Sequence, residues 1–355
     1  MMLSLTTLFA AAAGRGHARS GTDFQQAWQI YRRRFVRAEG RVVDTGNGGV
    51  SHTEGQGWGM LFAEAADDRQ TFDELWTWSR ANLMRPEDGL LSWRWLPNRA
   101  DPVPDRNNAT DGDLFAAWAL SRAARRWQEE AYRQAALRIS QTLLDRLVIR
   151  GDNGKVRALL PGLDGFRSDG GVTLNLSYYV FPALFELVEL EQGAAQRDRA
   201  ADWQALILQG LSLVRRARFG RSQLPPDWLR LGDDDSLAPD PGFPPRFGYD
   251  AVRVPLYLAW SGLLDADLAA PFQTLWSQSI PGWVDLSNDQ VSDYQERNGY
   301  RSVASLLLPA NRPPLDLPAD GLPTAEDNYY SASLTLLALL ATIIGKAQTN
   351  PAGFP

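Results

Sequence analysis

Three acidic residues that open predicted helices are the candidates for chemistry in this sequence. Glu54 stands in SHTEGQGWGM, Asp111 in NNATDGDLFAAWAL and Asp250 in RFGYDAVRVPLYLAW. Each acid could simply cap its helix, and Asp250 could also pair with Arg253 three residues later. On helices that converge, however, the same acids would face one another across a cleft. One carboxyl group could then donate a proton while another accepts one.

Several other chemistries lack the residues that they need. The sequence has no cysteine and only two histidines, which argues against thiol nucleophiles, serine–histidine–aspartate triads and zinc sites. The net charge of −6, without a long run of Lys and Arg, argues against nucleic acid as a partner. The acidic stretch GDDDSLAPDPG lacks the spacing of a calcium loop and is interpreted as a solvated loop. We expect no metal site and no cofactor.

The acids also have local structural interpretations. Thr110 is a good candidate for an N-cap, and Asp113, three residues later, could return the contact. Ser51 and Glu54 have the same spacing and could form a second capping box. Taken alone, each motif leaves capping and catalysis open.

Three glycines follow Glu54, at Gly55, Gly57 and Gly59, in the opening turns of a predicted helix. Each glycine inside a helix lowers helix stability by up to about 1 kcal/mol relative to alanine. Three glycines together therefore indicate that a side chain would not fit at these positions. The spacing matches neither a dinucleotide nor a nucleoside-triphosphate loop. We therefore expect close approach of a ligand or of another helix.

Helical periodicity recurs from residue 23 to residue 345, and glycine and proline concentrate in the joints. Hydrophobic residues make up 44% and charged residues 22% of the chain, as in an ordinary globular protein. No linker divides the chain, so we expect one domain of stacked helical hairpins, either a closed toroid or an open solenoid. The expected helices cover 23–38, 55–67, 70–84, 111–127, 129–148, 173–191, 198–218, 250–262, 266–279, 292–308 and 326–345.

A toroid would bring the three helix-opening acids together at one end of its inner ring. The chain is also rich in tryptophan, with 13 Trp beside 10 Tyr and 14 Phe, and indole faces stack well on sugar rings. Paired carboxyls and sugar-stacking aromatics are what glycoside hydrolysis requires. The pattern alone therefore indicates a carbohydrate hydrolase.

The segment ATDGDLFAAWALSRAARRW resembles the signature of glycoside hydrolase family 8, with departures at Ala116 and Ser121 on the helix body. TEGQGWGM is similar to the acid-bearing segment of that family, and FGYDAVRVPLYLAW is similar to its base-bearing segment. The three segments occur in the family's order, and the resemblance spans about residues 23–345. Within the family the sequence is most similar to bacterial periplasmic endoglucanases associated with cellulose synthesis.

The resemblance implies an all-α fold, an (α/α)6 barrel of six helical hairpins. It also implies an inverting endo-β-1,4-glucanase that acts on a β-1,4-glucan chain. Glu54 would be the general acid, Asp250 the general base that activates water, and Asp111 a partner of the sugar before the cut. Some members of the family place the base elsewhere, on a loop.

The resemblance assigns three further residues to substrate binding. Tyr178, in NLSYYVFPAL, and Arg253 match positions beside the attacking water and the base, although the register leaves Tyr179 as an alternative to Tyr178. Trp93, in GLLSWRW, matches a sugar-stacking position. Tyr178 and Trp93 could instead be core residues.

Inversion requires the two working carboxyls to stand roughly 6.5–9.5 Å apart, whereas about 5–5.5 Å indicates retention. Other substrates are open on the same scaffold, which could belong to a xylanase, a mixed-linkage glucanase or a chitosanase. A protein of another class, a glucan-binding factor without turnover, is a further alternative. Stacking alone would not need the three acids.

The chain begins with an apolar run, LSLTTLFAAAA, that resembles a secretory signal peptide within residues 1–20. We expect a single catalytic domain over 21–345, a tail over 346–355, and no membrane span. The expected protein is a periplasmic or secreted monomer. Cellulose synthase export machinery is a candidate partner.

Overall fold

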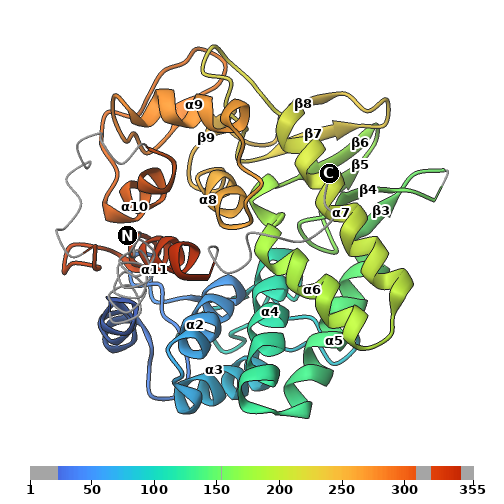
Figure 1. Cartoon of the computed structure of the whole chain (residues 1–355), viewed down its shortest axis with the longest axis vertical. Coiled ribbons are helices and arrows are strands. Elements are labelled where there is room, and N and C mark those ends of the chain that lie inside the picture. Colours follow the sequence, from blue (N-terminus) through green and yellow to red (C-terminus); the bar gives the residue numbers. More distant parts are fainter. Residues whose placement is uncertain (1–22, 153, 309–320, 345–355) are drawn as a thin grey trace, which may run out of the picture.

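The computed structural model describes residues 23–152, 154–308 and 321–344, and its helices are arranged as a ring (Figure 1). Residues 23–35 form the first helix. The other helices, in chain order, are α2 (Thr53–Ala65), α3 (Arg69–Asn82), α4 (Thr110–Trp127), α5 (Glu130–Arg146), α6 (Phe181–Gly193), α7 (Arg197–Arg216), α8 (Arg253–Trp260), α9 (Ala266–Trp276), α10 (Asn298–Leu307) and α11 (Tyr329–Ile344).

The ring is closed because its last helix packs against its first two. Ser333 Oγ in α11 donates a hydrogen bond to the Tyr31 hydroxyl in the first helix at 3.2 Å. The ring of Tyr329, also in α11, stacks on that of Trp58 in α2, with centroids 6.1 Å apart. These contacts decide for the toroid over the open solenoid.

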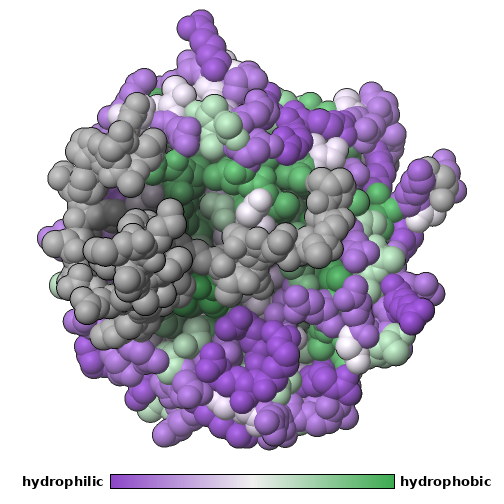
Figure 2. All heavy atoms as spheres, in the orientation of Figure 1, coloured by the Kyte–Doolittle hydropathy of each residue, from purple (hydrophilic) through white to green (hydrophobic). Residues whose placement is uncertain are grey.

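The helices form an inner and an outer layer. Figure 1 shows α2, α4, α6, α8 and α11 around the centre, with α3, α5, α7 and α9 outside them. The burial of the residues agrees with this division into layers. In inner helix α2, 11 of the 13 residues are buried, whereas in outer helix α5 only 6 of the 17 residues are buried. Inner helices are apolar on all sides because they have neighbours on all sides. On the face drawn in Figure 2, hydrophilic residues dominate the rim and hydrophobic ones gather toward the middle.

Outer and inner helices alternate along the chain from α2 to α9. The alternation is interrupted after outer helix α9. Residues 277–297 follow it, and they contain turns and strand β10 (Val284–Asp285) in place of a helix. The helix that we expected from residue 292 therefore begins only at Asn298. Residues 291–295 instead form bridges with residues 281–284.

The helix expected over residues 173–191 also begins later, at Phe181. Before it the chain forms strand β6 (Gly171–Leu174) and the short 3-10 helix η1 (Leu176–Tyr178). Strand β6 pairs with β7 (Leu229–Gly232) of a distant segment, and such long-range pairing overrides local helical periodicity.

Short antiparallel strands connect the helices at several points. The sheet that includes β6 has four strands in the order β5-β6-β7-β8. The remaining strands pair in twos. Their bounds are β1 (Ser51–His52), β2 (Arg94–Trp95), β3 (Val148–Arg150), β4 (Val156–Leu159), β5 (Arg167–Ser168), β8 (Leu237–Pro239) and β9 (Arg246–Phe247).

The glycines at the start of α2 accommodate neighbouring helices. A Cβ at Gly57 would lie 2.5 Å from Phe115 Cβ in α4, and one at Gly55 would lie 2.3 Å from the Tyr329 hydroxyl. In the reverse direction, a Cβ at Gly112 in α4 would lie 2.2 Å from Thr53 Oγ1. Close approach of a neighbouring helix, one of the two explanations that we expected, therefore accounts for the glycines at Gly55 and Gly57.

Two expectations concern parts of the chain that the structure does not describe. The proposed signal segment, residues 1–20, and the tail, residues 346–355, both lie outside the described residues. Among the described residues, no helix is both long and apolar enough to cross a membrane.

Gly57→Ala should lower the free energy of unfolding by roughly 1–3 kcal/mol, because the added methyl group overpacks the contact between α2 and α4. Gly193→Ala is the matched control, since nothing lies within 4 Å of the added Cβ at this helical position. Alanine there should be neutral or slightly stabilising. Urea unfolding of both variants measures the difference, and equal stabilities would contradict the close helix contact.

Candidate active site

A single guanidinium group, that of Arg253, lies among the three acids singled out by the sequence. Arg253 is the first residue of α8, and only 2% of its surface is exposed. Its Nη1 contacts Glu54 Oε1 and lies 3.2 Å from Asp111 Oδ2, and its Nη2 lies 2.7 Å from Asp250 Oδ1. The start of α2, the start of α4 and the turn before α8 thus meet at one cation.

Glu54 is the second residue of α2 and takes no part in capping that helix. The expected capping box with Ser51 is wrong, because Ser51 Oγ donates to the Val42 carbonyl oxygen. The N-cap of α2 is His52, which makes no side-chain capping bond. The Glu54 carboxyl is therefore free to face Arg253, and 18% of its side chain stays exposed.

Asp111 is the second residue of α4 and is buried, with 2% of its surface exposed. The expected N-cap at Thr110 is wrong, because Thr110 Oγ1 donates to the Leu160 carbonyl oxygen at 2.7 Å and thereby fixes the helix start to a neighbouring loop. Asp111 Oδ1 accepts the N–H of Gly112 at 2.8 Å. Burial raises the pKa of Asp111 to about 7.

The capping contact that the sequence allowed for Asp113 is not formed. Its Oδ1 accepts the backbone N–H of Leu91 at 2.8 Å, and its Oδ2 accepts from Asn108 Nδ2 at 2.9 Å. Complete burial raises its pKa to about 8. Asp113 is therefore a structural residue that fixes two loop segments near the acids.

Asp250 lies in the turn before α8, and its side chain is 22% exposed. The pair with Arg253 is present, but the side chain does not cap α8, whose N-cap is Val252. Burial raises the pKa of Asp250 well above its ordinary value, and the nearby carboxylates of Asp227 and Asp111 raise it further. Asp227 was not among the sequence candidates.

The structure distinguishes between the two adjacent tyrosines. Tyr178, the last residue of η1, lies near Asp111 and Asp250, and burial together with these two carboxylates raises the pKa of its hydroxyl well above the ordinary value. Tyr179 is fully buried, and its hydroxyl accepts the backbone N–H of Leu159 at 2.8 Å. Tyr178 is therefore the tyrosine that belongs to the site.

Trp93 is half-buried on the Glu54 side of the site. Its ring lies nearly parallel to that of His52, with centroids 6.0 Å apart, and the Arg94 guanidinium lies 4.3 Å from its centroid. Trp93 Nε1 donates to Asp105 Oδ2 at 2.7 Å. These contacts hold the indole near the acid without burying it in the core.

A cavity of about 330 Å³ borders Glu54. Tyr249 and Tyr330 line part of it, and their rings stack with centroids 3.9 Å apart. Tyr249 is 55% exposed, so its ring is available to a ligand. Neither tyrosine was a candidate from the sequence, although Tyr249 directly precedes Asp250 and Tyr330 lies within the last expected helix.

A second aromatic group extends from Tyr178. The ring of Trp228 lies 6.3 Å from that of Tyr178 and stacks on Phe243 at 4.5 Å and on Phe166 at 5.9 Å. Phe243 is 38% exposed. All three of these rings come from loops and strand ends without helical periodicity, which is why the sequence did not reveal the group.

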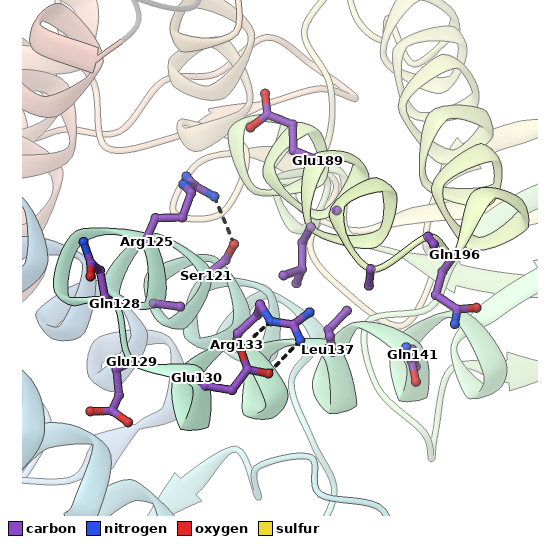
Figure 3. A pocket seen from close by; sticks show the side chains of 15 residues that line it. Ser121, Arg125, Gln128, Glu129, Glu130, Arg133, Leu137, Gln141, Glu189 and Gln196 are labelled. Atoms are coloured by element: carbon purple, nitrogen blue, oxygen red, sulfur yellow. Dashed lines mark hydrogen bonds and ion pairs between the residues drawn. The ribbon is translucent and has the colours of Figure 1, made fainter.

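Another cavity, of about 850 Å³, lies toward the other end of α4, among residues of α4, α5 and α6 (Figure 3). Two of its carboxyls have other partners, because Glu130 pairs with Arg133 and Glu129 pairs with Arg69. The helix start that carries Asp111 lies at the opposite end of α4. This cavity is therefore not the place where the three acids act.

The charges around Arg253 do not balance if all three acids are ionised, because three negative charges would face one positive charge in a buried space. Such an arrangement is costly, and proton uptake by a carboxyl relieves it. Burial raises the pKa of Asp111, and burial raises that of Asp250 together with the neighbouring carboxylates of Asp227 and Asp111. The site can therefore hold a carboxylic acid beside a carboxylate near neutral pH.

Comparison with known proteins gives a consistent family. The model of glycosyl hydrolases family 8 matches residues 1–343. A probable endoglucanase from Novacetimonas hansenii is 43% identical over 323 residues, which cover 89% of this chain and 90% of that protein. An endoglucanase from Cellulomonas uda is 39% identical over 289 residues, covering 80% of this chain and 77% of that protein.

Solved structures agree in fold. The endo-β-1,4-glucanase CMCax from Acetobacter xylinum is 42% identical and superposes with a TM-score of 0.83, covering 92% of this chain and 99% of that one. A reducing-end-xylose-releasing exo-oligoxylanase, 18% identical, has a TM-score of 0.71 and shares the fold. The comparisons confirm the expected all-α (α/α)6 barrel.

Arg253→Met should cost roughly 3–5 kcal/mol of stability at pH 8, because it leaves buried carboxyls without their cation. Without Arg253 the folded-state pKa values of these acids rise further above their unfolded values. Protonation then supports the fold at low pH, and this support is lost as the pH rises through the folded-state values. Urea unfolding should therefore show a larger loss at pH 8 than at pH 5.

Arg122→Met is the control for this experiment. Arg122 also pairs with a buried acid, Glu64, but Arg126 contacts the same carboxylate and would keep it paired. The control should lose little stability and show little pH dependence. Equal losses in the two variants would contradict the special role of Arg253.

Proposed function

This chain belongs to glycosyl hydrolases family 8, and from that premise we propose that it is an endoglucanase that cleaves β-1,4-glucan with inversion. Endoglucanase activity is supported by the names of relatives that are similar over most of both chains. The β-1,4 linkage is supported by the similar Acetobacter xylinum enzyme. The observation that carries the mechanism is the group of three carboxyls around Arg253, in which burial raises the pKa of Asp111 to about 7.

Glu54 is the proposed general acid and Asp250 the proposed general base. Asp250 takes a proton from a water molecule as the water oxygen bonds to the anomeric carbon and the bond from that carbon to the glycosidic oxygen breaks. Glu54 gives its proton to the departing oxygen. The division of roles follows the resemblance of TEGQGWGM and FGYDAVRVPLYLAW to the acid- and base-bearing segments of family 8. The structure brings both carboxyls to one guanidinium, Glu54 to Nη1 and Asp250 to Nη2.

The separation of the two carboxyls also bears on inversion. An inverting enzyme needs a gap of roughly 6.5–9.5 Å for the attacking water. In the structure, Arg253 contacts both carboxyls, Glu54 through Nη1 and Asp250 through Nη2. Inversion is proposed from the resemblance to family 8, and the first anomer of the product tests it. A separation of about 5–5.5 Å would favour retention instead.

Asp111 and Tyr178 are proposed to orient the sugar and the water, respectively. Asp111 shares Arg253 Nη1 with Glu54, so its carboxyl adjoins the acid and is placed to accept from a sugar hydroxyl. Tyr178 lies near both Asp111 and Asp250. A hydroxyl whose pKa is raised stays protonated and can donate a hydrogen bond to water or to Asp250.

Aromatic rings on either side of the acids are proposed to bind the glucan chain. Trp93 adjoins His52 on the Glu54 side, Tyr249 borders the cavity beside Glu54, and Trp228 extends from Tyr178. Rings on both sides of the cut suit an enzyme that binds the middle of a chain. Pyranose rings stack on such faces through their C–H groups, as other apolar surfaces do.

Glu54→Gln should lower turnover of carboxymethyl cellulose by roughly 100- to 10,000-fold, because glutamine has no acidic proton to donate. Reducing-sugar release measures turnover, and calorimetry with a cello-oligosaccharide should show that binding is preserved. Glu189→Gln is the control, since Glu189 lines the other cavity and should keep wild-type activity.

Unchanged turnover in Glu54→Gln would exclude Glu54 as the acid. A wild-type protein that binds cello-oligosaccharides but releases no reducing sugar would instead support the alternative of a glucan-binding factor. Xylan, mixed-linkage glucan and chitosan in the same assay separate the other substrates from cellulose.

The stereochemistry of the first product is a separate prediction. Direct attack of water on a β-linked chain yields the α-anomer first, and mutarotation then forms the β-anomer. A proton NMR time course on a soluble cello-oligosaccharide should show this order. Initial appearance of the β-anomer would contradict inversion while leaving the substrate assignment intact.

A further inference from the structure

Asp227 makes an unusual set of contacts with the segment that carries Asp250. A single oxygen, Asp227 Oδ1, accepts three backbone N–H groups, from Gly248 at 3.1 Å, Asp250 at 3.0 Å and Ala251 at 2.7 Å. Asp227 lies 23 positions before Asp250 in the sequence, so this is a tertiary contact. The base proposed above is thus held by its own amide and by those of two neighbours.

The segment that Asp227 holds has no other side-chain cap. Helix α8 begins at Arg253, and its N-cap Val252 offers no polar side chain. Backbone N–H groups at the start of a helix need acceptors from outside it, and a carboxylate there also complements the helix dipole. Asp227 accepts from the amides of Gly248, Asp250 and Ala251 in the turn just before this helix start. The amides of Arg253 and Val254 then donate to the carbonyl oxygens of Asp250 and Ala251, so the turn that Asp227 holds supplies the acceptors for the helix. The Asp227 N–H donates to the Arg246 carbonyl oxygen at 2.6 Å.

The second oxygen of Asp227 packs closely against the same backbone. A Cβ added at Gly248 would lie 3.1 Å from Asp227 Oδ2 and 3.3 Å from Trp283 Cβ. This approach leaves little room for a side chain at position 248. Both oxygens of the Asp227 carboxyl therefore contact the segment around Gly248, Oδ1 through hydrogen bonds and Oδ2 through close packing.

Asp227 also affects Asp250 through its charge. The Asp227 carboxylate raises the pKa of Asp250, since a nearby negative charge disfavours ionisation. Burial raises the pKa of Asp227 itself to about 6, while its three backbone donors and Arg246 act in the opposite direction. The ionised form of either carboxyl therefore disfavours ionisation of the other.

We propose that Asp227 is a positioning residue that fixes the Asp250 loop and sets the pH range in which Asp250 accepts a proton from water. The proposal rests on the proposed role of Asp250 as the base. Asp227 does not touch the substrate in this account. It acts through the backbone amides that it holds and through its charge.

Other groups act on the same pair and remain in place when Asp227 is changed. Asp250 faces the cation of Arg253 from α8, and Asp227 faces the cation of Arg246 from β9. The remaining titratable groups that interact with Asp250 are Asp111 from α4, Tyr178 from η1, Tyr249 from the adjoining turn, Tyr300 from α10 and Tyr330 from α11.

The test compares Asp227→Asn with Asp240→Asn in the full chain. Asparagine keeps an oxygen for the three N–H groups but removes the charge, so the acid limb of kcat/KM against pH should move to lower pH. Asp240 is a matched control, because it is 6% exposed and accepts from the Gly242 N–H and from Thr173 Oγ1. Its variant should keep the wild-type pH profile.

Asp227→Ala removes the acceptor as well as the charge. Misplacement of the base should then lower kcat by roughly 10- to 100-fold with little change in KM. Asp227→Asn should recover most of this loss at its own optimum. Calorimetry with a cello-oligosaccharide on both variants shows whether they are folded and bind ligand.

Two failures can be distinguished. If Asp227→Asn shows the wild-type acid limb, like Asp240→Asn, the proposal for Asp227 is overturned while the function of Asp250 stands. If Asp250→Asn retains wild-type turnover, the base assignment itself fails. A fall in thermal stability of Asp227→Asn with no change in its pH profile would also overturn the proposal, because it would show a structural role alone.

Discussion

One buried guanidinium among three carboxyls is the constraint on which this site depends. Arg253 contacts Glu54, Asp111 and Asp250, and its single charge cannot neutralise all three. A buried group of this kind must hold protons, and general acid catalysis needs a proton held near neutral pH. In the proposed mechanism, a proton held in this group serves general acid catalysis, while the cation of Arg253 limits the electrostatic cost of burying the three acids.

The rest of the structure brings these groups to one place. Gly57 and Gly112 let α2 and α4 approach closely enough for Glu54 and Asp111 to share one nitrogen of Arg253. The third acid stands on a turn and not on a helix, and Asp227 holds that turn through three amides. Rigid inner helices therefore carry two of the acids, while a polar contact between loops places the third.

The sequence predicted the parts of the site that follow local rules. Glycine-rich or acidic helix starts revealed Glu54 and Asp111, and helical periodicity with a family resemblance revealed the barrel. Local rules failed where distant segments compete: Thr110 and Ser51 bond to neighbouring loops instead of capping, and β6 replaces an expected helical turn. Asp227 could not be found, because its partners lie more than twenty residues away and no periodic pattern marks it.

The most direct test of the account is a crystal structure of Glu54→Gln with a cello-oligosaccharide bound. A glycosidic oxygen should lie within hydrogen-bonding distance of residue 54. A water held by Asp250 should lie on the opposite face of the sugar ring, with aromatic contacts on both sides of the glycosidic bond. A chain bound only in the cavity beside Arg125, or an anomeric carbon in direct contact with Asp250 with no room for water, would contradict the account.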